Sequence, residues 1–246
     1  MIKSLLGAFR TLTRFPLPHQ AMEREERTLF WFPFVGAFLG LFSVGISFLP
    51  LPPSVLSALM IATCAYLTRG FHLDGLCDFA DGLGGGWTKE RALAIMKDSH
   101  SGAFALIVLC CTLLIQYAAL QSLMQIRLAL VLVPSFGRLM QVLAAATMDY
   151  ARSGEGTASA LVRSARKRHA LVAGVQLTLL FVALFFLVPE NLFISSLASV
   201  CSALMVALVV MRIAQKRLGG VTGDVLGAIE VLAETAAMVG FLIPLA

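Results

Sequence analysis

The sequence predicts an all-α, polytopic integral membrane protein with about six to seven transmembrane helices. Of its 246 residues, 59% are hydrophobic and only 13% are charged, whereas a soluble domain is about half apolar and a quarter charged. The apolar residues gather in runs close to the length of about 20 residues that a helix needs to cross a bilayer core. No soluble domain remains once these runs are removed, so residues 1–246 are expected to form a single membrane-embedded domain.

The first residues predict a short amphipathic helix that lies in the membrane interface. Its polar side carries Lys3 and Arg10. The apolar positions at helical spacing are Ile2, Leu5, Leu6, Phe9 and Leu12. Because Arg10 and Arg14 interrupt the apolar run and no small-residue cleavage site follows, a secretory signal peptide is not expected.

Seven segments are candidate spans. They are residues 29–49, 54–68, 102–124, 128–148, 169–188, 191–211 and 225–245. The second is short, and the seventh carries Glu230 and Glu234, so the expected number of crossings is six to seven.

The basic residues predict which side of the membrane each loop faces. Of the 19 lysines and arginines, 17 lie in the segments 1–28, 69–101, 149–168 and 212–223. The intervening loops near 50–53, 125–127 and 189–190 carry only Arg127. Since Lys and Arg favour cytoplasmic loops, the amino terminus and the large polar loops are expected inside and the carboxyl terminus outside. Topology and contact with membrane lipid account for the net charge of +5, and no nucleic-acid partner is expected.

The stretch "RGFHLDGLCDFADGLGGGW", residues 69–87, places three carboxylates in an apolar setting. Asp74, Asp78 and Asp81 are spaced i, i+4 and i+7, which puts them on one face of a helix. The glycines at 82 and 84–86 are expected to end this helix. A second short helix is expected to start near Thr88 and to deliver Asp98 and His100 at its end.

Three carboxylates on one helix face repel each other, and partial desolvation near a bilayer raises the cost. A hard divalent cation would neutralise them, since Mg²⁺ is commonly held by one or two carboxylates plus substrate phosphates. Asp224 enters its span on the same side of the membrane and is a candidate to complete the site. The alternative is an ordinary solvated acidic face, but acids are scarce here, with 14 in the whole chain.

A second polar cluster, "RLGGVTGDVLGAIEVLAE" at 217–234, precedes and enters the last span. Gly219, Gly220 and Gly223 permit close backbone approach. Thr222 or Asp224 is expected to cap the helix, whose first amides are suited to hold an anion. The alternative is a simple glycine turn with an N-cap.

Arg138 lies inside the fourth span, where an isolated charge is costly. Two interpretations stay open: it pairs with Glu230 or Glu234, or it contacts a substrate phosphate. His72 and His100 flank the acids in sequence, and either is a candidate substrate contact or general base.

These residues resemble the cobalamin synthase family, the adenosylcobinamide-GDP ribazoletransferases. The matching pieces are "LTRFPLP" near the start, "FHLDGLCDFADG", "IMKDSHSGAFA", Arg138, "YAR" at 150–152 and "RLGGVTGDVLGAIEVLAE". They follow the family's order and span essentially the whole chain. The stretch from His72 to Gly82 is highly specific, whereas the role of the "YARSGEG" region stays open.

The resemblance implies an enzyme of the bacterial inner membrane that joins adenosylcobinamide-GDP to α-ribazole, or to its 5′-phosphate. The products would be adenosylcobalamin, or its phosphate, and GMP. It implies one or two Mg²⁺ ions as cofactor, which agrees with the carboxylates, and a homo-oligomer is possible.

The resemblance also implies residue roles. The metal ligands would be Asp74, Asp78 and Asp81, completed or supported by Asp98 and Asp224. One of these carboxylates, or His72, would take the proton of the attacking hydroxyl. The substrate-binding candidates are Lys97, Arg138, Gly220 and Thr222.

Two other functions were weighed against this one. A CDP-alcohol phosphotransferase would carry D-x-x-D-G-x-x-A-R followed by a later glycine. Asp78, Asp81 and Gly82 match, but Gly85 and Gly86 replace the Ala and Arg, and Ile95 replaces that later glycine. A cation or proton-coupled transporter would place acids midway in several spans, whereas most acids here lie in the predicted loops.

Overall fold

The computed structural model describes residues 2–17, 25–154, 156, 158–187 and 189–243. The elements in chain order are α1 (Ile2–Leu12), the 3-10 helix η1 (Glu25–Trp31), α2 (Phe32–Ile46), α3 (Pro53–Leu67), α4 (Phe71–Gly85), α5 (Lys89–Ile95), α6 (Ala103–Leu123), α7 (Arg127–Thr147), α8 (Ser159–Ser164), α9 (Lys167–Leu187), α10 (Glu190–Leu218) and α11 (Gly223–Leu242). Within these residues the β-structure is one isolated bridge, between Tyr150 and Val221. The all-α prediction is therefore confirmed.

Five helical segments in the described ranges are long and apolar enough to cross a membrane. They are Glu26–Ile46, Ala103–Leu123, Arg127–Thr147, Glu190–Leu218 and Gly223–Leu242. These confirm five of the predicted spans, although the last residues of the seventh, 244 and 245, lie outside the described part. α9 coincides with the predicted span at 169–188 but is not among these five.

The second predicted span, 54–68, differs from expectation. It forms α3, and α3 meets the length and hydropathy requirement only together with α4, to which it is bent by 89°. The break lies at Arg69 and Gly70, which both adopt the left-handed conformation, with φ of 60° and 64°. Residues in this conformation end a helix. The carboxylate segment is thus the second half of a bent pair, rather than a helix within a separate loop.

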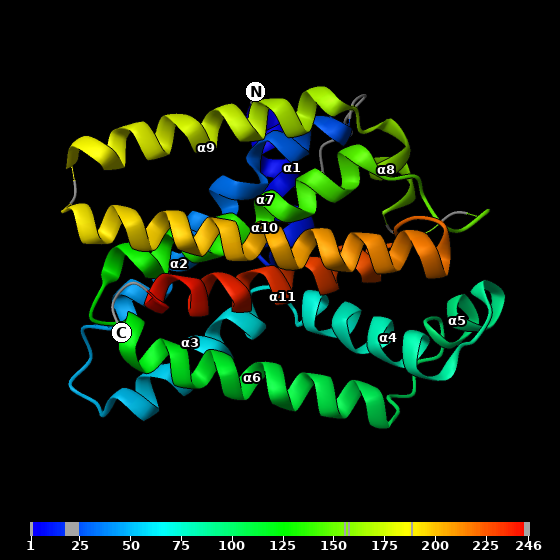
Figure 1. Ribbon diagram of the computed structural model, residues 1–246, viewed down its shortest axis with the longest axis horizontal. Helices are drawn as coiled ribbons and strands as arrows, with labels where there is room; N and C mark the ends of the chain where they lie inside the picture. Colours follow the sequence, from blue (N-terminus) through cyan, green and yellow to red (C-terminus); the bar gives the residue numbers. More distant parts are fainter. Residues whose placement is uncertain (1, 18–24, 155, 157, 188, 244–246) are drawn as a thin grey trace.

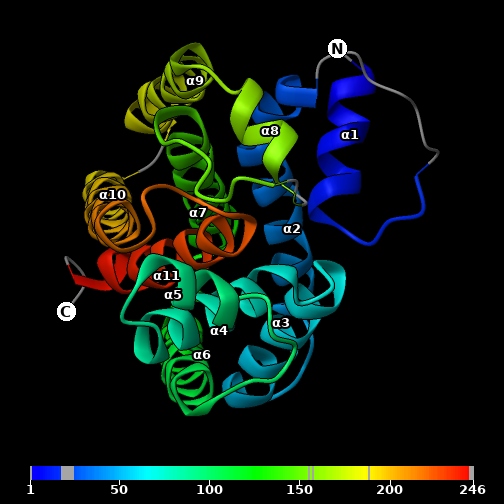
Figure 2. The ribbon, with the colours of Figure 1, turned by 90° about the vertical axis from the view of Figure 1, so that its right-hand side faces the viewer.

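The long helices run roughly along one axis, as Figure 1 shows. The α4–α5 region, the segment after α7 and the α10–α11 turn lie at one end, on the right in Figure 1, and the carboxyl end of α11 lies at the other. α7 and α11 are the most buried of the five spans. In the perpendicular view of Figure 2, α7 and α11 lie between the other helices. Connections far apart in sequence therefore meet at one end of the bundle.

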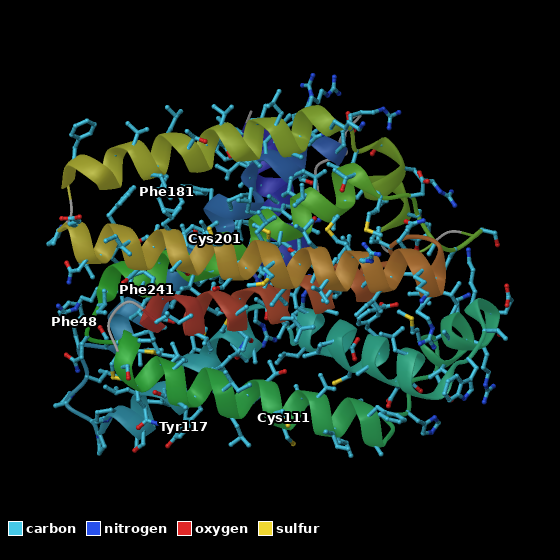
Figure 3. The ribbon with its side chains drawn as sticks, in the orientation of Figure 1. Phe48, Cys111, Tyr117, Phe181, Cys201 and Phe241 are labelled. Carbon is cyan, nitrogen blue, oxygen red and sulfur yellow. The ribbon has the colours of Figure 1, made fainter. Side chains whose placement is uncertain are left out.

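The outer faces of the spans are apolar. Leu114 of α6, Leu171 of α9 and Met205 of α10 expose 66%, 68% and 61% of their surface. Figure 3 shows side chains of this kind projecting outward along the bundle, while Phe241 is buried within it. An extended apolar exterior of this kind is suited to lipid, so the protein is a multi-pass membrane protein.

The amino-terminal helix α1 has the predicted amphipathic pattern. Ser4, Ala8 and Leu12 form its buried side. Its Phe9 ring meets Phe38 of α2 edge-on, with centroids 5.0 Å apart. α1 therefore forms the predicted helix and packs beside α2, but Ile2 of the predicted apolar side is 74% exposed, and its place in the membrane interface stays a prediction.

Candidate active site

The predicted carboxylate face is present on α4, and the burial of its acids increases along the helix. Asp74 is exposed, Asp78 is half-buried and Asp81 is buried. The helix ends at Gly85, within the glycines that were expected to end it. Gly82 and Gly84 also let the side chains of Met96 and Phe104 approach the helix backbone. The three acids are therefore held on one rigid element.

Asp81 binds the start of another helix, α6. Its two carboxylate oxygens accept hydrogen bonds from the backbone N–H groups of Gly102, at 2.5 Å, and Ala105, at 2.9 Å. These amides are at the start of α6, where backbone donors lack partners within the helix and negative charge is favourable. Asp81 thus fixes α4 to α6, and its predicted role as a principal metal ligand stays a prediction.

Asp224 is brought to the α4 carboxylates by close contact between two helices. A Cβ at Gly75 would lie 2.8 Å from the backbone oxygen of Asp224, so only glycine permits this approach of α4 to α11. The charges that act on Asp78 are those of Asp74, Asp224 and Asp81, which repel it, and of Arg152, which attracts it. Asp224 therefore lies beside α4, as expected, and its role as a metal ligand stays a prediction.

Arg152 is the basic residue of this cluster that sequence reasoning did not assign. Its Nη2 donates to Asp224 Oδ2 at 2.9 Å and to the backbone oxygen of Met96 at 3.4 Å. The only sequence signal for it was its place in the "YAR" segment. Its partner lies far away in sequence, so spacing alone gave no reason to pair them.

Backbone hydrogen bonds place Arg152 beside α11. Val221 donates to the oxygen of Asp149 and accepts from the amide of Ala151, each at 2.8 Å. Gly220, with φ of 154°, makes this possible, since a Cβ there would lie 2.2 Å from the Asp149 oxygen. The buried Gly220 thus lets the 149–151 segment pack against the start of α11, and its predicted contact with substrate stays a prediction.

Thr222 caps α11, as predicted. Its hydroxyl accepts from the amide of Val225 at 3.2 Å and lies 3.2 Å from Asp224 Oδ2. Thr222 is fully buried in this capping role, and its predicted contact with substrate stays a prediction. Nearby, Arg217 donates to the carbonyl oxygens of Leu83 and Gly86 at the end of α4.

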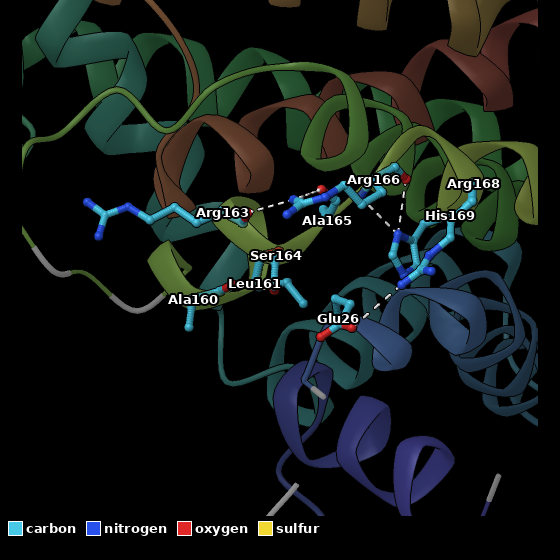
Figure 4. A network of polar contacts seen from close by, with 9 residues as sticks. All are labelled: Glu26, Ala160, Leu161, Arg163, Ser164, Ala165, Arg166, Arg168 and His169. Atoms are coloured by element: carbon cyan, nitrogen blue, oxygen red, sulfur yellow. Dashed lines mark hydrogen bonds and ion pairs between the residues drawn. The ribbon is translucent and has the colours of Figure 1, made fainter. Parts of the chain in front are cut away.

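A second set of polar contacts, drawn in Figure 4, fixes α8 and the start of α9. Arg166 donates to the carbonyl oxygens of Arg163 and Ala165, at 2.9 and 2.8 Å. Arg163 in turn donates to the oxygens of Ser153 and Gly154. The segment that carries Arg152 is therefore held from both sides, by α11 and by α8.

Lys97, Asp98 and His100 lie exposed on the connection between α5 and α6. The Asp98 carboxylate is 2.7 Å from the His100 ring nitrogen. Hydrogen bonds from the side chain and backbone of His100 lower the pKa of Asp98. The Asp98 carboxylate is thus held by His100, and its predicted role as a metal ligand stays a prediction.

His72 and Arg138 lie in the interior instead. His72 is only 3% exposed and Arg138 only 1%. Arg138 Nη1 is 2.5 Å from Glu230 Oε1, so the structure shows the pairing interpretation of this arginine. His72 precedes Asp74 by two positions, which places it on the opposite side of α4 from the carboxylates.

The fold and site together define a polytopic membrane protein with carboxylates and arginine gathered where its helices end. The chain matches the model of the CobS family, described as cobalamin-5-phosphate synthase, over residues 4–242. It belongs to this family and is a transferase of cobalamin synthesis, which confirms the resemblance and decides against the two alternative functions.

Curated relatives cover nearly the whole chain. An adenosylcobinamide-GDP ribazoletransferase of Chlorobium phaeovibrioides is 38% identical over 240 residues, 95% of this chain and 94% of that protein. One from Ectopseudomonas mendocina is 38% identical over 247 residues, 97% of this chain and 98% of its own length. One from Chlorobaculum parvum is 39% identical over 251 residues, 96% of this chain and 93% of its own length. No solved structure matches the chain.

Proposed function

We propose that this chain transfers the adenosylcobinamide phosphate group of adenosylcobinamide-GDP to α-ribazole or its 5′-phosphate, and that the reaction occurs where α4, α11 and the 148–152 segment meet. The single observation that carries this placement is the close approach of α4 to α11 at Gly75, which brings Asp224 and its partner Arg152 to the helix that carries Asp74 and Asp78. The names of the relatives supply the substrates.

The carboxylates fit Mg²⁺ as cofactor. Asp74, Asp78 and Asp224 offer the oxygen donors that this ion prefers, and Arg152 is the one cation among the charges acting on Asp78. Among the described residues, no three His, Cys, Asp or Glu side chains could hold a metal on their own. This favours an ion that shares its ligands with substrate phosphates. Mg²⁺, when bound, would neutralise charge on the pyrophosphate and on the leaving phosphate.

The chain's own residues would position the reactants and move one proton. The ribose 3′-hydroxyl of α-ribazole attacks the phosphorus attached to cobinamide, forming an O–P bond while the bond from that phosphorus to GMP breaks. The half-buried Asp78 takes the hydroxyl proton, and GMP leaves with the bonding electron pair. Asp74 and Asp224 orient the phosphate end of the donor, and Arg152 keeps Asp224 in place. Lys97, exposed on the neighbouring connection, is suited to contact a donor phosphate.

We also assign this end of the bundle to the cytoplasmic side of the bacterial inner membrane. The loops at this end carry most of the lysines and arginines of the chain, and such residues favour the cytoplasmic side. Lipid would surround the apolar exterior.

The test is turnover by purified protein with both substrates and Mg²⁺, with GMP and the corrinoid product separated by chromatography. Asp78→Asn should lower turnover by roughly a hundredfold or more, the scale for one preorganised electrostatic group. Glu90→Gln, which removes an exposed carboxylate on α5, is the matched control and should keep turnover. Near wild-type turnover in Asp78→Asn at limiting Mg²⁺ would contradict the assignment of this site.

A further inference from the structure

A cavity of about 70 Å³ lies inside the bundle, away from the carboxylate face of α4. Side chains from α2, α3, α4, α6, α7 and α11 line it, and most of them are apolar. The charged residues in the lining are Arg138, Glu230 and Glu234. The remaining titratable groups are Cys64 of α3 and His72 of α4. The transferase mechanism uses none of these five residues.

The charges of this lining do not balance. Arg138 offsets one carboxylate, that of Glu230, through the 2.5 Å ion pair. Glu234 has no second arginine or lysine in the cavity wall. An uncompensated charge in a low-dielectric interior costs several kcal/mol, so one further positive charge is required.

Glu230 and Glu234 are one helical turn apart on α11, and both line the cavity. Gly137 of α7 packs against both residues: a Cβ built there would lie 3.1 Å from Glu234 Cβ and 3.2 Å from Glu230 Oε1. Two ionised carboxylates on one buried helix face would repel each other, and a proton on one of them removes that repulsion.

His72 supplies an independent observation at the same place. It lines the cavity at 3% exposure, and neither ring nitrogen has a hydrogen-bond partner. A proton on one carboxyl group would supply the missing positive charge without any further ligand.

We propose that this cavity is a proton-binding site, in which Glu234 holds one proton shared with Glu230, beside Arg138 and within the chamber lined by His72. The proton comes from water and keeps the interior neutral. The site is separate from the transferase chemistry. Its tests therefore measure stability and carboxyl protonation rather than turnover.

Two identical substitutions one helical turn apart test the proposal. Gln has the shape of a protonated Glu, so Glu234→Gln should leave the unfolding temperature in detergent unchanged or raised at neutral pH. Glu230→Gln should lower it, because Arg138 loses its partner. A loss of stability in Glu234→Gln as large as that in Glu230→Gln would overturn the proposal.

Infrared spectroscopy observes the proton directly. Wild-type protein at neutral pH should show the carbonyl band of a protonated carboxylic acid. Glu234→Gln should lack this band. The control Glu190→Gln, on the first turn of α10, should retain it. Identical carbonyl bands in wild type and Glu234→Gln would overturn the proposal. A second outcome would also overturn it: sodium stabilises wild type more than choline does at equal ionic strength, and Glu234→Gln abolishes this difference. The carboxylate would then be ionised and bind an alkali cation.

Discussion

Arg138 and Glu230 form an ion pair in the interior of the bundle, with Nη1 and Oε1 2.5 Å apart. The two residues come from α7 and α11, the most buried of the five long apolar spans. Taking either charge out of water alone would be costly, and their pairing offsets that cost. This relationship explains why a span carries an arginine, and it leaves the phosphate chemistry to residues at the end of the bundle.

Breaking this pair should be strongly destabilising. Arg138→Gln is expected to lower the free energy of unfolding by about 3–5 kcal/mol, since it leaves Glu230 buried without its partner. The double variant Arg138→Gln with Glu230→Gln should recover much of the loss. Arg138→Lys should keep most stability and activity if the residue acts only through its charge. Unfolding in detergent measures all three. Arg138→Gln as stable as wild type would contradict the pairing.

Much of the fold follows from local pattern, but the contacts between helices do not. Apolar runs and loop charges predicted the spans, and the i, i+4, i+7 spacing predicted the shared face of Asp74, Asp78 and Asp81. The sequence did not predict that α3 and α4 form one bent pair, because the bend depends on the positive φ of Arg69, which composition does not reveal.

The site was predicted in part for the same reason. Asp224 was correctly expected near α4, because both entered from the same side of the membrane. The capping of α6 by Asp81 and the pairing of Arg152 with Asp224 depend on segments distant in sequence. Residue type alone therefore could not distinguish Asp81, which fixes two helices, from Asp78, which faces the other carboxylates.

Asp81 should matter for stability as a helix cap. Asp81→Ala removes the acceptor for the amides of Gly102 and Ala105, and loss of a cap costs about 0.5–2 kcal/mol. Because this role does not involve metal, the loss measured by unfolding in detergent should be the same with Mg²⁺ and with a chelator. An Asp81→Ala variant that loses stability only in the presence of Mg²⁺ would identify Asp81 as a ligand.

The orientation of the bundle can be checked with reporter fusions. Fusions after residues 88, 160 and 218 should report the cytoplasm, because the basic residues concentrate in those loops. A fusion after Ala246 should report the outside, since α11 runs to the opposite end. Cytoplasmic activity of the Ala246 fusion would mean that residues 225–245 do not cross the membrane.

Removing Arg152 should make the protein depend on divalent cations. Arg152 Nη2 lies 2.9 Å from Asp224 Oδ2, and its charge also acts on Asp78. In Arg152→Gln, Asp224 would lose the guanidinium 2.9 Å from its carboxylate, so the repulsion among Asp74, Asp78 and Asp224 would be less opposed and the metal-free protein should lose stability. Mg²⁺ should restore more stability to this variant than it adds to wild type, because a bound ion replaces the missing positive charge.

The experiment compares thermal unfolding of wild type and Arg152→Gln across a Mg²⁺ titration, starting from chelator. Arg163→Gln is the matched control, since its guanidinium holds the same segment through Ser153 and Gly154 but has no contact with Asp224. Arg163→Gln should change stability equally with and without Mg²⁺. Adding Asp224→Asn to Arg152→Gln should remove much of the metal dependence, because one carboxylate of the cluster is then neutral. Equal Mg²⁺ responses in wild type and Arg152→Gln would show that these carboxylates do not share a cation.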